Sequence, residues 1–493
     1  MSSLTQFWLQ RIATLANTSQ TLYYSFLWLL VFIGVAFLLF FPISALLSFA
    51  WIAVIASVEN PANWQNNDWI LAASLLAWAG YASWVSLTLL KMKPELPSGK
   101  PLDQKVFPVL ADRINELCST YQSPEFPHIK LTTRFRIELV RTASNGFPTN
   151  LRNTLLIGLP VMTCMSPLQF KLLLARQIGH LSKNHRSFSR LPVHLRNVWN
   201  SYEQHYAQAW RAETILLRLF FSWFAPFFYL SSIAAVRLEA FPKDKLLLEI
   251  TPPAMAAEAI TIYEIKKRYL FTNYWPKLND AAYAKAKPPY LPYSSMSMIM
   301  SKVLDHDRDY IQNCYEGAIN REVALESELP NLMKRLIKIE HEDFRIPEAN
   351  DDKAAPHFLG EHLKDLLKQM DNIWYLKNKA IWSKRYKQGV EERRRLKLLH
   401  EQAAQALLSN AEAREYLLLI EKYIDAKKAL PLFKTILKTN SMDAGVCYDL
   451  GRLLLEADDS SGVDALKISM ENEPHRTADC CQPIVTYMAK HGH

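Results

Sequence analysis

The sequence predicts a mostly α-helical fold of the α+β class. Three observations lead to this expectation: two long uncharged stretches within the first ninety residues, short strand-like runs between 128 and 162, and helical patterns through most of the remainder. The chain has 493 residues, which is enough for roughly two to four domains.

The region 1–93 is expected to be a membrane anchor. No Asp, Glu, Lys or Arg occurs between Arg11 and Glu59. A second uncharged run extends from Trp69 to Leu90. As a helix, each run can cross about 30 Å of hydrocarbon.

We expect transmembrane segments at about 22–57 and 69–90, with Pro42 bending the first. A cleaved signal peptide is the alternative interpretation. It is disfavoured because the first apolar run is much longer than the apolar part of a signal peptide, and because a second span follows.

The flanking charges predict the orientation of this hairpin. Arg11 precedes the first span, Lys91 and Lys93 follow the second, and the connection between the spans carries only acidic residues. Because cytoplasmic flanks are rich in Lys and Arg, we expect an integral inner or plasma membrane protein with the bulk of the chain in the cytoplasm. The net charge of +9 fits attraction to the lipid bilayer, and no nucleic-acid motif suggests a nucleic-acid partner.

A mixed domain is expected over 104–341, after the Pro-rich segment 93–103. Apolar runs at 128–133, 135–144 and 153–162 predict three short strands. A helix is expected to follow, since "SPLQ" places an N-cap serine, a first-turn proline and a capping-box glutamine at 166–169.

The aromatic stretch 215–236 is nearly long enough to span a membrane. Arg218 and Pro226 lie inside it, and a third span would carry the following region to the opposite side. We therefore expect a buried or membrane-grazing helix rather than a crossing one.

The chain beyond the polar linker 342–356 is expected to be helical. Residues 357–410 predict a charged helical region with a solvated face. Short amphipathic helices over 411–493 favour a tetratricopeptide-like region, because related apolar segments recur at about the length of that repeat. Such stacks bind a protein partner, although a plain helical cap is the alternative.

The stretch "RQIGH", 176–180, lies in the predicted helix where a zinc peptidase would carry His-Glu-x-x-His. With its surroundings it resembles the membrane zinc metallopeptidases of the CAAX prenyl protease and HtpX type. "NGFPTN" from 145 is similar to the start of that family's edge strand, "RLEAFPKD" (237–244) to its Arg-x-x-Glu-x-x-Ala-Asp helix, and "LPNLMKRL" (329–336) to its His-Pro-x-x-x-x-Arg segment.

The resemblance implies a role for each matching position. It places the first histidine ligand of zinc at Arg176, the general base at Gln177 and the second histidine ligand at His180. The remaining implied positions are the third ligand at Ala240, supporting residues at Arg237 and Asp244, and a substrate-binding strand at Asn145, Gly146 and Phe147. Only His180 retains the residue type that zinc chemistry requires.

These departures predict a degenerate site. Zinc needs lone-pair donors at about 2 Å, which a protonated arginine and an alanine cannot supply. Rescue by Glu239 or His185 is disfavoured, because their spacing places them on poorly matched helix faces. We expect the Arg176 guanidinium to occupy the vacated metal position and to pair with Asp244 or Glu239.

The sequence therefore predicts a membrane-anchored pseudopeptidase that binds polypeptide through its cleft and a protein partner through its C-terminal repeats, without a cofactor. It would regulate a true protease or act in membrane protein quality control. One alternative is an active zinc endopeptidase with unusual ligands, which alone would need zinc. The other is a helical scaffold unrelated to peptidases.

Overall fold

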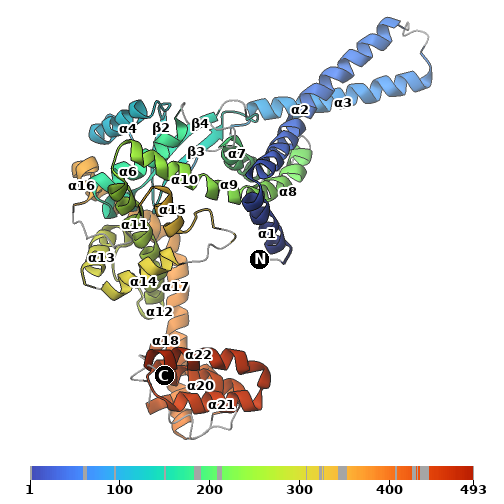
Figure 1. Cartoon of the computed structure of the whole chain (residues 1–493). Coiled ribbons are helices and arrows are strands. Elements are labelled where there is room, and N and C mark those ends of the chain that lie inside the picture. The colour runs from blue at the N-terminus through green and yellow to red at the C-terminus, as the bar shows by residue number, and fades with distance from the viewer. Residues whose placement is uncertain are drawn as a thin grey trace. The chain divides into compact units, whose positions relative to one another are not determined.

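The chain is mostly helical and contains one four-stranded sheet (Figure 1). It divides into two compact units. Unit 1 comprises Met1–Asn273 and Pro292–Asn372, and unit 2 comprises Tyr274–Leu291 and Ile373–His493. The computed structural model describes residues 3–58, 64–93, 96–148, 151–182, 190–207, 214–306, 308–320, 325, 327–341, 352–405, 408–424, 429, 431–433 and 443–491.

The N-terminal region forms three helices: α1 (Ser3–Thr18), α2 (Gln20–Val58) and α3 (Asn66–Lys91). Helix α2 runs through Pro42 and has 39 residues, so it is about 58 Å long. Three segments are long and apolar enough to cross a membrane: Gln20–Val58, Asn66–Lys91 and Ile215–Glu249. The two expected spans are thus both present as long apolar helices.

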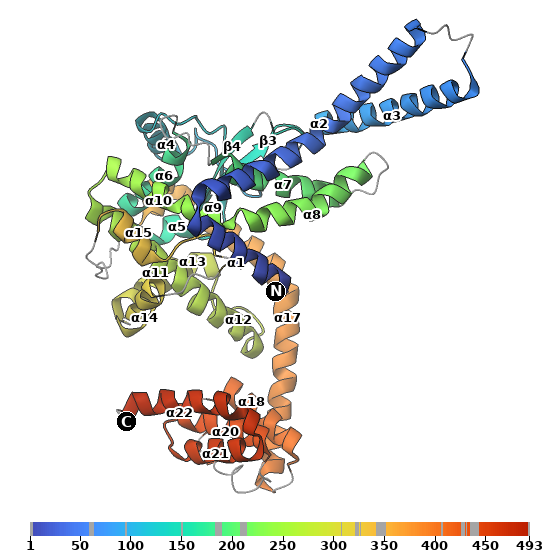
Figure 2. The same cartoon turned by 45° about the vertical axis from the view of Figure 1, so that its right-hand side comes forward.

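The first half of α2 packs into unit 1, together with α7 (Arg190–Ala207), α8 (Ile215–Ser231) and α9 (Ile233–Leu238) (Figure 2). The rings of Phe37 on α2 and Phe220 on α8 stack with centroids 3.8 Å apart. Gly34 is buried where α2 meets Trp199 and Phe224. Anchor and domain therefore share one aromatic-rich core.

The second half of α2 and most of α3 carry apolar side chains that no other part of unit 1 covers. Beyond Pro42, the exposed large residues of α2 are Ile43, Leu46, Leu47, Phe49, Trp51, Val54 and Val58. On α3 they are Trp69, Ile70, Leu71, Leu76, Trp84, Leu87 and Leu90. A surface of this size and composition is typical of a segment in contact with lipid.

Helix α8 buries one face and exposes the other. Phe221, Phe224 and Phe228 are fully buried, whereas Leu219 and Trp223 are more than half exposed. Its 17 residues measure about 25 Å, which is slightly short for a complete crossing. Whether the stretch 215–236 crosses or grazes the membrane stays a prediction.

The sheet has the strand order β1-β2-β4-β3. Its strands are β1 (Lys100–Pro101), β2 (His128–Thr132), β3 (Ile137–Ala143) and β4 (Leu151–Gly158). Strand β4 pairs parallel with β2 and antiparallel with β3. The last five residues of β4 are buried, which explains why its sequence is a continuous apolar run and not an alternating one.

The strand expected at 153–162 ends earlier than its apolar pattern suggests. The chain turns into helix α5 (Leu159–Cys164) directly after Gly158. Pro160 stands in the first turn of α5, where a missing backbone N–H is tolerated. A buried strand and a buried short helix have the same apolar composition, so periodicity could not separate them.

Further helices surround the sheet in unit 1. They are α4 (Pro108–Thr120), α6 (Pro167–Ile178), η2 (Gly179–Leu181), α10 (Ala240–Lys245), η5 (Leu246–Glu249), α11 (Pro253–Tyr269), α13 (Pro292–His306), α14 (Arg308–Ile319), α15 (Leu332–Lys338) and α16 (Ala354–Leu359). The buried carboxylate of Asp371 accepts hydrogen bonds from the backbone N–H groups of Tyr293 and Ser294, at 2.7 and 3.1 Å. It thereby caps the start of α13.

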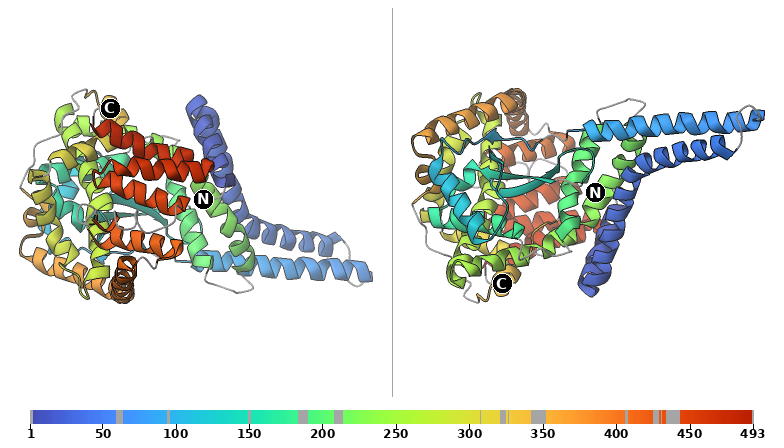
Figure 3. Two further views of the ribbon diagram at one scale, coloured as in Figure 1. Left: turned by 90° about the horizontal axis from the view of Figure 1, so that it is seen from below. Right: turned by 90° about the horizontal axis from the view of Figure 1, so that it is seen from above.

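Unit 2 contains α12 (Trp275–Ala284), most of α17 (Leu363–Ala404), α18 (Asn410–Tyr423), α20 (Ala444–Glu456), α21 (Ser461–Asn472) and α22 (Thr477–His491). The last three lie side by side as the red helices of Figure 3. Gly451 and Gly462 let α20 and α21 approach closely, because a Cβ at either glycine would come within 3 Å of the other helix. Packed short helices agree with the expectation for 411–493, and the tetratricopeptide-like assignment stays a prediction.

Gly34 provides a test of the shared core. Gly34→Leu would force a side chain into space where even a Cβ lies 2.9 Å from the Phe224 ring. We expect the free energy of unfolding in detergent to fall by about 1–3 kcal/mol. Gly80→Leu on α3 is the matched control, since nothing lies within 4 Å of its Cβ position, and it should change stability by less than about 0.5 kcal/mol. Equal effects of the two variants would contradict the shared core.

Candidate functional site

Helix α6 begins as its sequence predicts. The Ser166 hydroxyl accepts from the backbone N–H of Gln169, and the Gln169 side chain accepts from the Ser166 backbone N–H, which completes the capping box. The α-helix ends at Ile178, and His180 lies in the 3₁₀ turn η2. Arg176 and His180 are thus four residues apart but belong to different types of helical turn.

Arg176 points into the protein and pairs with Asp244 on α10. Its Nε lies 2.5 Å from Asp244 Oδ1, and its side chain is 11% exposed. The Asp244 side chain is completely buried. The expected pairing of the guanidinium with Asp244 is therefore present, and Arg176 does not project into solvent.

A second arginine, Arg335 on α15, holds the same carboxylate. Its Nε donates to Asp244 Oδ2 at 2.7 Å and its Nη2 donates to Oδ1 at 3.1 Å. Its third nitrogen, Nη1, donates to Glu264 Oε1 at 2.8 Å. Arg335 is the arginine of the 329–336 segment, so the resemblance pointed to this residue without indicating its contacts.

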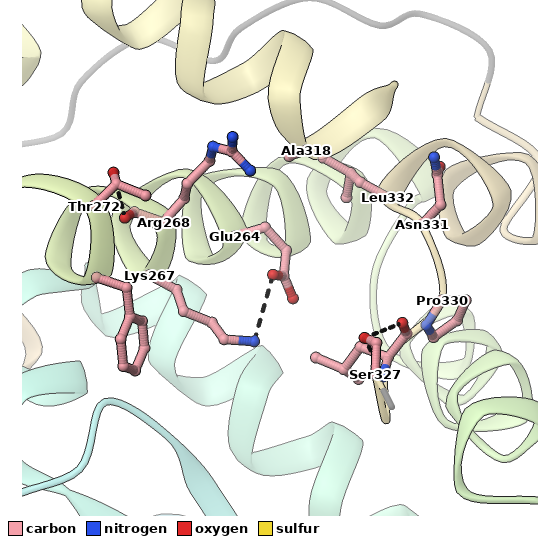
Figure 4. A pocket seen from close by; sticks show the side chains of 11 residues that line it. Glu264, Lys267, Arg268, Thr272, Ala318, Ser327, Pro330, Asn331 and Leu332 are labelled. Atoms are coloured by element: carbon pink, nitrogen blue, oxygen red, sulfur yellow. Dashed lines mark hydrogen bonds and ion pairs between the residues drawn. The ribbon is translucent and has the colours of Figure 1, made fainter. Parts of the chain in front are cut away.

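Glu264 on α11 extends this network toward a small pocket (Figure 4). The Lys267 ammonium lies 3.6 Å from its second carboxylate oxygen. Burial alone would raise the pKa of Glu264, but Lys267, Arg335 and Arg176 outweigh it and hold the pKa below its ordinary value. Glu264 therefore stays ionised beside these cations.

Arg176, Arg335, Asp244 and Glu264 form a largely buried charge network, which Lys267 extends at its more exposed end. Two guanidinium groups face two carboxylates through charge-assisted hydrogen bonds, so the charges balance. The network joins α6, α10, α11 and α15. Its effect is to fix these four helices, because removing one charge would leave its counterpart buried and unpaired.

A second polar cluster lies at the end of α6. The Nδ1 of buried His180 is 3.7 Å from the carboxylate of buried Glu239. The ring centroid of His194 on α7 lies 5.5 Å from that of His180. Sequence reasoning disfavoured Glu239 as a replacement metal ligand and did not identify His194 at all, because only the packing of α7 brings the His194 ring close to His180. His185 lies outside the described residues.

The residues at the implied metal position do not fit zinc. The protonated guanidinium of Arg176 stands at the implied first ligand position. Buried Ala240, at the implied third ligand position, offers no lone pair. Across the described part of the chain, no three His, Cys, Asp or Glu side chains come together as a metal site would require. We therefore assign no chemistry to a metal at this position.

Gln177 and Arg237 occupy different surroundings. Gln177 is half-buried, and its amide cannot take a proton from water as a carboxylate would. Arg237 donates from Nε and Nη2 to the carbonyl of Ser327 at 3.0 and 2.8 Å, and from Nη2 to the carbonyl of Leu325 at 2.9 Å. Arg237 therefore binds this loop segment through the backbone carbonyl groups of Leu325 and Ser327.

Asn145, Gly146 and Phe147 lie in the turn after β3. The Gly146 N–H donates to the carbonyl of Leu89 on α3 at 2.8 Å, and a Cβ there would lie 2.4 Å from that oxygen. A glycine is required by this close approach. The turn is therefore joined to the end of the second span.

The resemblance implies an edge strand in the segment 145–162. The strand found there, β4, is not at the edge of the sheet, so this expectation is wrong. Strand β4 lies between β2 and β3, so both of its sides are paired. The outer strand on this side is β3, which pairs with β4 alone among the described residues. An added polypeptide strand would have to lie along β3, for which the sequence gave no specific signal.

Comparison of this chain with family models, with curated proteins and with solved structures finds no match. The resemblance to membrane zinc metallopeptidases therefore rests on the quoted motifs alone.

Asp244→Asn tests the buried network. The substitution keeps the shape of the side chain but leaves two guanidinium groups facing a neutral amide, so we expect a loss of about 3–5 kcal/mol in the free energy of unfolding. Glu116→Gln is the control, because Glu116 bridges to Arg113 and Lys171 on the surface and should cost at most about 1 kcal/mol. Denaturant titration in detergent measures both, and a loss at Asp244 no larger than at Glu116 would refute the structural role.

A separate prediction concerns Lys266, which is buried on α11 and donates to the carbonyl of Cys164. Burial lowers the pKa of Lys266 to about 8. In the unfolded chain a lysine titrates near about 10.4, so the unfolded state binds more protons between these values and stability should rise with pH across this window. Below about pH 8 the buried charge is fully destabilising.

Lys266→Met lacks this titration. The free energy of unfolding of the wild type, minus that of the variant, should increase by about 3 kcal/mol between about pH 8 and 10.4. Parallel stability curves for the two proteins would show that Lys266 titrates normally.

Proposed function

We propose that this protein is a membrane-anchored, catalytically inactive relative of the zinc metallopeptidases that it resembles, and that it binds polypeptide without cleaving it. The observation that carries the proposal is the Arg176–Asp244 pair. A guanidinium held by a buried carboxylate stands on the helix face where the resemblance implies a metal ligand. Such a side chain repels a divalent cation and offers it no lone pair.

Hydrolysis of a peptide bond also needs an activated water molecule. In the implied mechanism a glutamate next to the first histidine takes a proton from metal-bound water. Gln177 stands at that position and has no basic oxygen for the proton. The loss of base and metal together supports binding as the retained activity.

Two features offer places for a polypeptide. Strand β3 has one side without a paired strand among the described residues, and a sheet edge can pair with an extended peptide through main-chain hydrogen bonds. Within unit 2, a groove of about 400 Å³ lies between α20 and α22, with Tyr448, Leu455 and Tyr487 in its lining. Aromatic and aliphatic walls of this kind suit a protein partner.

The anchor sets where this binding would occur. Helices α2 and α3 would span an inner or plasma membrane, and the basic residues Arg11, Lys91 and Lys93 would keep both ends in the cytoplasm. A binding protein at this position could regulate a membrane protease or hold proteins during membrane quality control.

A specific observation favours one second candidate, an active zinc endopeptidase with unusual ligands. His180, Glu239 and His194 gather at the end of α6, and their side chains are the types that zinc accepts. This candidate needs the three groups to converge further than they do here. It makes the opposite prediction about metal content.

Metal analysis of the purified full-length protein separates the two candidates. We expect no stoichiometric zinc, no cleavage of fluorescein-labelled casein, and binding of that casein in its unfolded form. A variant combining Arg176→His, Gln177→Glu and Ala240→Glu restores the implied donor set and should take up more zinc than the wild type. The proposal would be overturned by stoichiometric zinc in the wild type, lost in His180→Ala, together with casein cleavage that a chelator abolishes.

A further inference from the structure

Arg196 on α7 is a buried cation away from the Arg176 network. Its side chain is 6% exposed. The guanidinium carbon lies 3.5 Å from the centre of the Tyr229 ring, which is a close cation–π contact. Its Nη1 pairs with the Glu328 carboxylate at 2.9 Å. One arm of the guanidinium is therefore engaged with a carboxylate.

The other two nitrogens of the Arg196 guanidinium, Nε and Nη2, are donors without acceptors in the described part of the chain. Both nitrogens are buried. A buried donor without an acceptor is destabilising, and more so when the donor is charged. An arginine retained under this cost is a candidate binding group.

Glu328 covers Arg196 from the solvent side. Its carboxylate side chain is 43% exposed, and it also accepts a hydrogen bond from the Tyr229 hydroxyl at 3.0 Å. The neighbouring Ser327 is held through its backbone carbonyl by Arg237. The backbone next to Glu328 is therefore held by Arg237, whereas the Glu328 side chain itself is partly exposed to solvent.

We propose that Arg196 is a receptor for a carboxylate group of a bound polypeptide, and that Glu328 is an internal occupant which this ligand displaces. The incoming carboxylate would lie against the guanidinium in the planar, two-bond arrangement that Arg forms with carboxylates. The Tyr229 ring supports the guanidinium from its face. The proposal rests on the polypeptide-binding function proposed above, and it names a chemical class of ligand.

The site lies beside the strand edge that a polypeptide would use. Helix α7, which carries Arg196, packs against β3. On β3, burial raises the pKa of Glu138, and Glu328 adds a smaller upward contribution. Arg136, 2.6 Å from the Glu138 carboxylate, opposes this shift. A chain paired along β3 could therefore place one acidic group at Arg196.

A carboxylate fits this site better than a phosphate. A single guanidinium with one neutral tyrosine neutralises one negative charge, and Glu328 and Glu138 would repel a doubly charged ligand. Glu328 itself shows that one carboxylate oxygen can accept from both Arg196 Nη1 and the Tyr229 hydroxyl. We therefore assign the site to carboxylates and treat phosphate as an outcome of the test.

The first experiment examines the site with a small ligand. Glu328→Gln removes the internal carboxylate from the full-length protein, and Glu316→Gln removes an exposed carboxylate on α14 as a matched control. Sodium acetate, compared with sodium chloride and sodium phosphate at equal ionic strength, should raise the thermal midpoint of Glu328→Gln only. Wild type and Glu316→Gln should respond equally to all three salts.

The second experiment examines the polypeptide. Three fluorescein-labelled peptides of equal length are compared: one with a central glutamate and an amidated end, one with glutamine and an amidated end, and one with glutamine and a free C-terminus. Glu328→Gln should bind at least one carboxylate-bearing peptide about tenfold more tightly than the neutral one, and more tightly than wild type does. The stronger of the two carboxylate peptides identifies side chain or chain end as the source.

The outcomes separate this inference from the proposed function. Equal binding of all three peptides would retain polypeptide binding and overturn the carboxylate receptor. Stabilisation by acetate without binding of any peptide would overturn the polypeptide as ligand. Stabilisation by phosphate equal to that by acetate would overturn the assignment to carboxylates.

Adding Arg196→Lys to Glu328→Gln should remove the acetate effect and the tenfold preference, because lysine keeps the charge but not the planar pair of donors. If this double variant does not fold, the comparison of Glu328→Gln with Glu316→Gln still decides the matter. No acetate response in Glu328→Gln overturns the receptor.

Discussion

The carboxylate of Asp244 is the group on which the packing of α6, α10, α11 and α15 depends. It is fully buried, and it accepts from Arg176 on one helix and from Arg335 on another. A buried anion of this kind is tolerated only while both cations are in place. Through Glu264 the same interaction reaches α11, so four helices are fixed by one set of charges. The arrangement is held by charge-assisted hydrogen bonds between oppositely charged side chains of the protein itself.

The anchor is part of the domain and not a separate attachment. Helix α2 enters the core at Gly34 and stacks Phe37 on Phe220 of α8, so the aromatic residues of α7 and α8 are buried against the first span. This explains why so many aromatic residues occur in 199–228. The described aromatic residues of α7 and α8 fill the junction between α2 and the rest of unit 1, where large flat side chains bury much area with few rotatable bonds.

Local sequence features predicted the positions of several helices well. They could not predict which residues far apart in the sequence would come into contact. The capping box at Ser166 and the uncharged runs of α2 and α3 are local features, and each element begins or extends about where they indicate. The end of β4 at Gly158 was missed because an apolar run does not distinguish a strand from a buried helix. The expectation that Arg176 would pair with Asp244 or Glu239 needed the resemblance, which implied that these positions lie together, as well as the rule that a buried arginine needs an anion. Arg335, His194 and Arg196 depended on packing between helices far apart in the sequence, which no spacing rule encodes.

The hydrogen bond from the Gly146 N–H to the Leu89 carbonyl fixes the position of the sheet relative to the end of α3. Leu89 is two residues before the end of α3, so the β3–β4 turn is attached about half a helical turn from the point where the second candidate span ends. The sheet cannot separate from the end of α3 or rotate freely against it while this contact persists. The distance between β3 and the end of α3 is therefore set by backbone geometry instead of by a flexible tether.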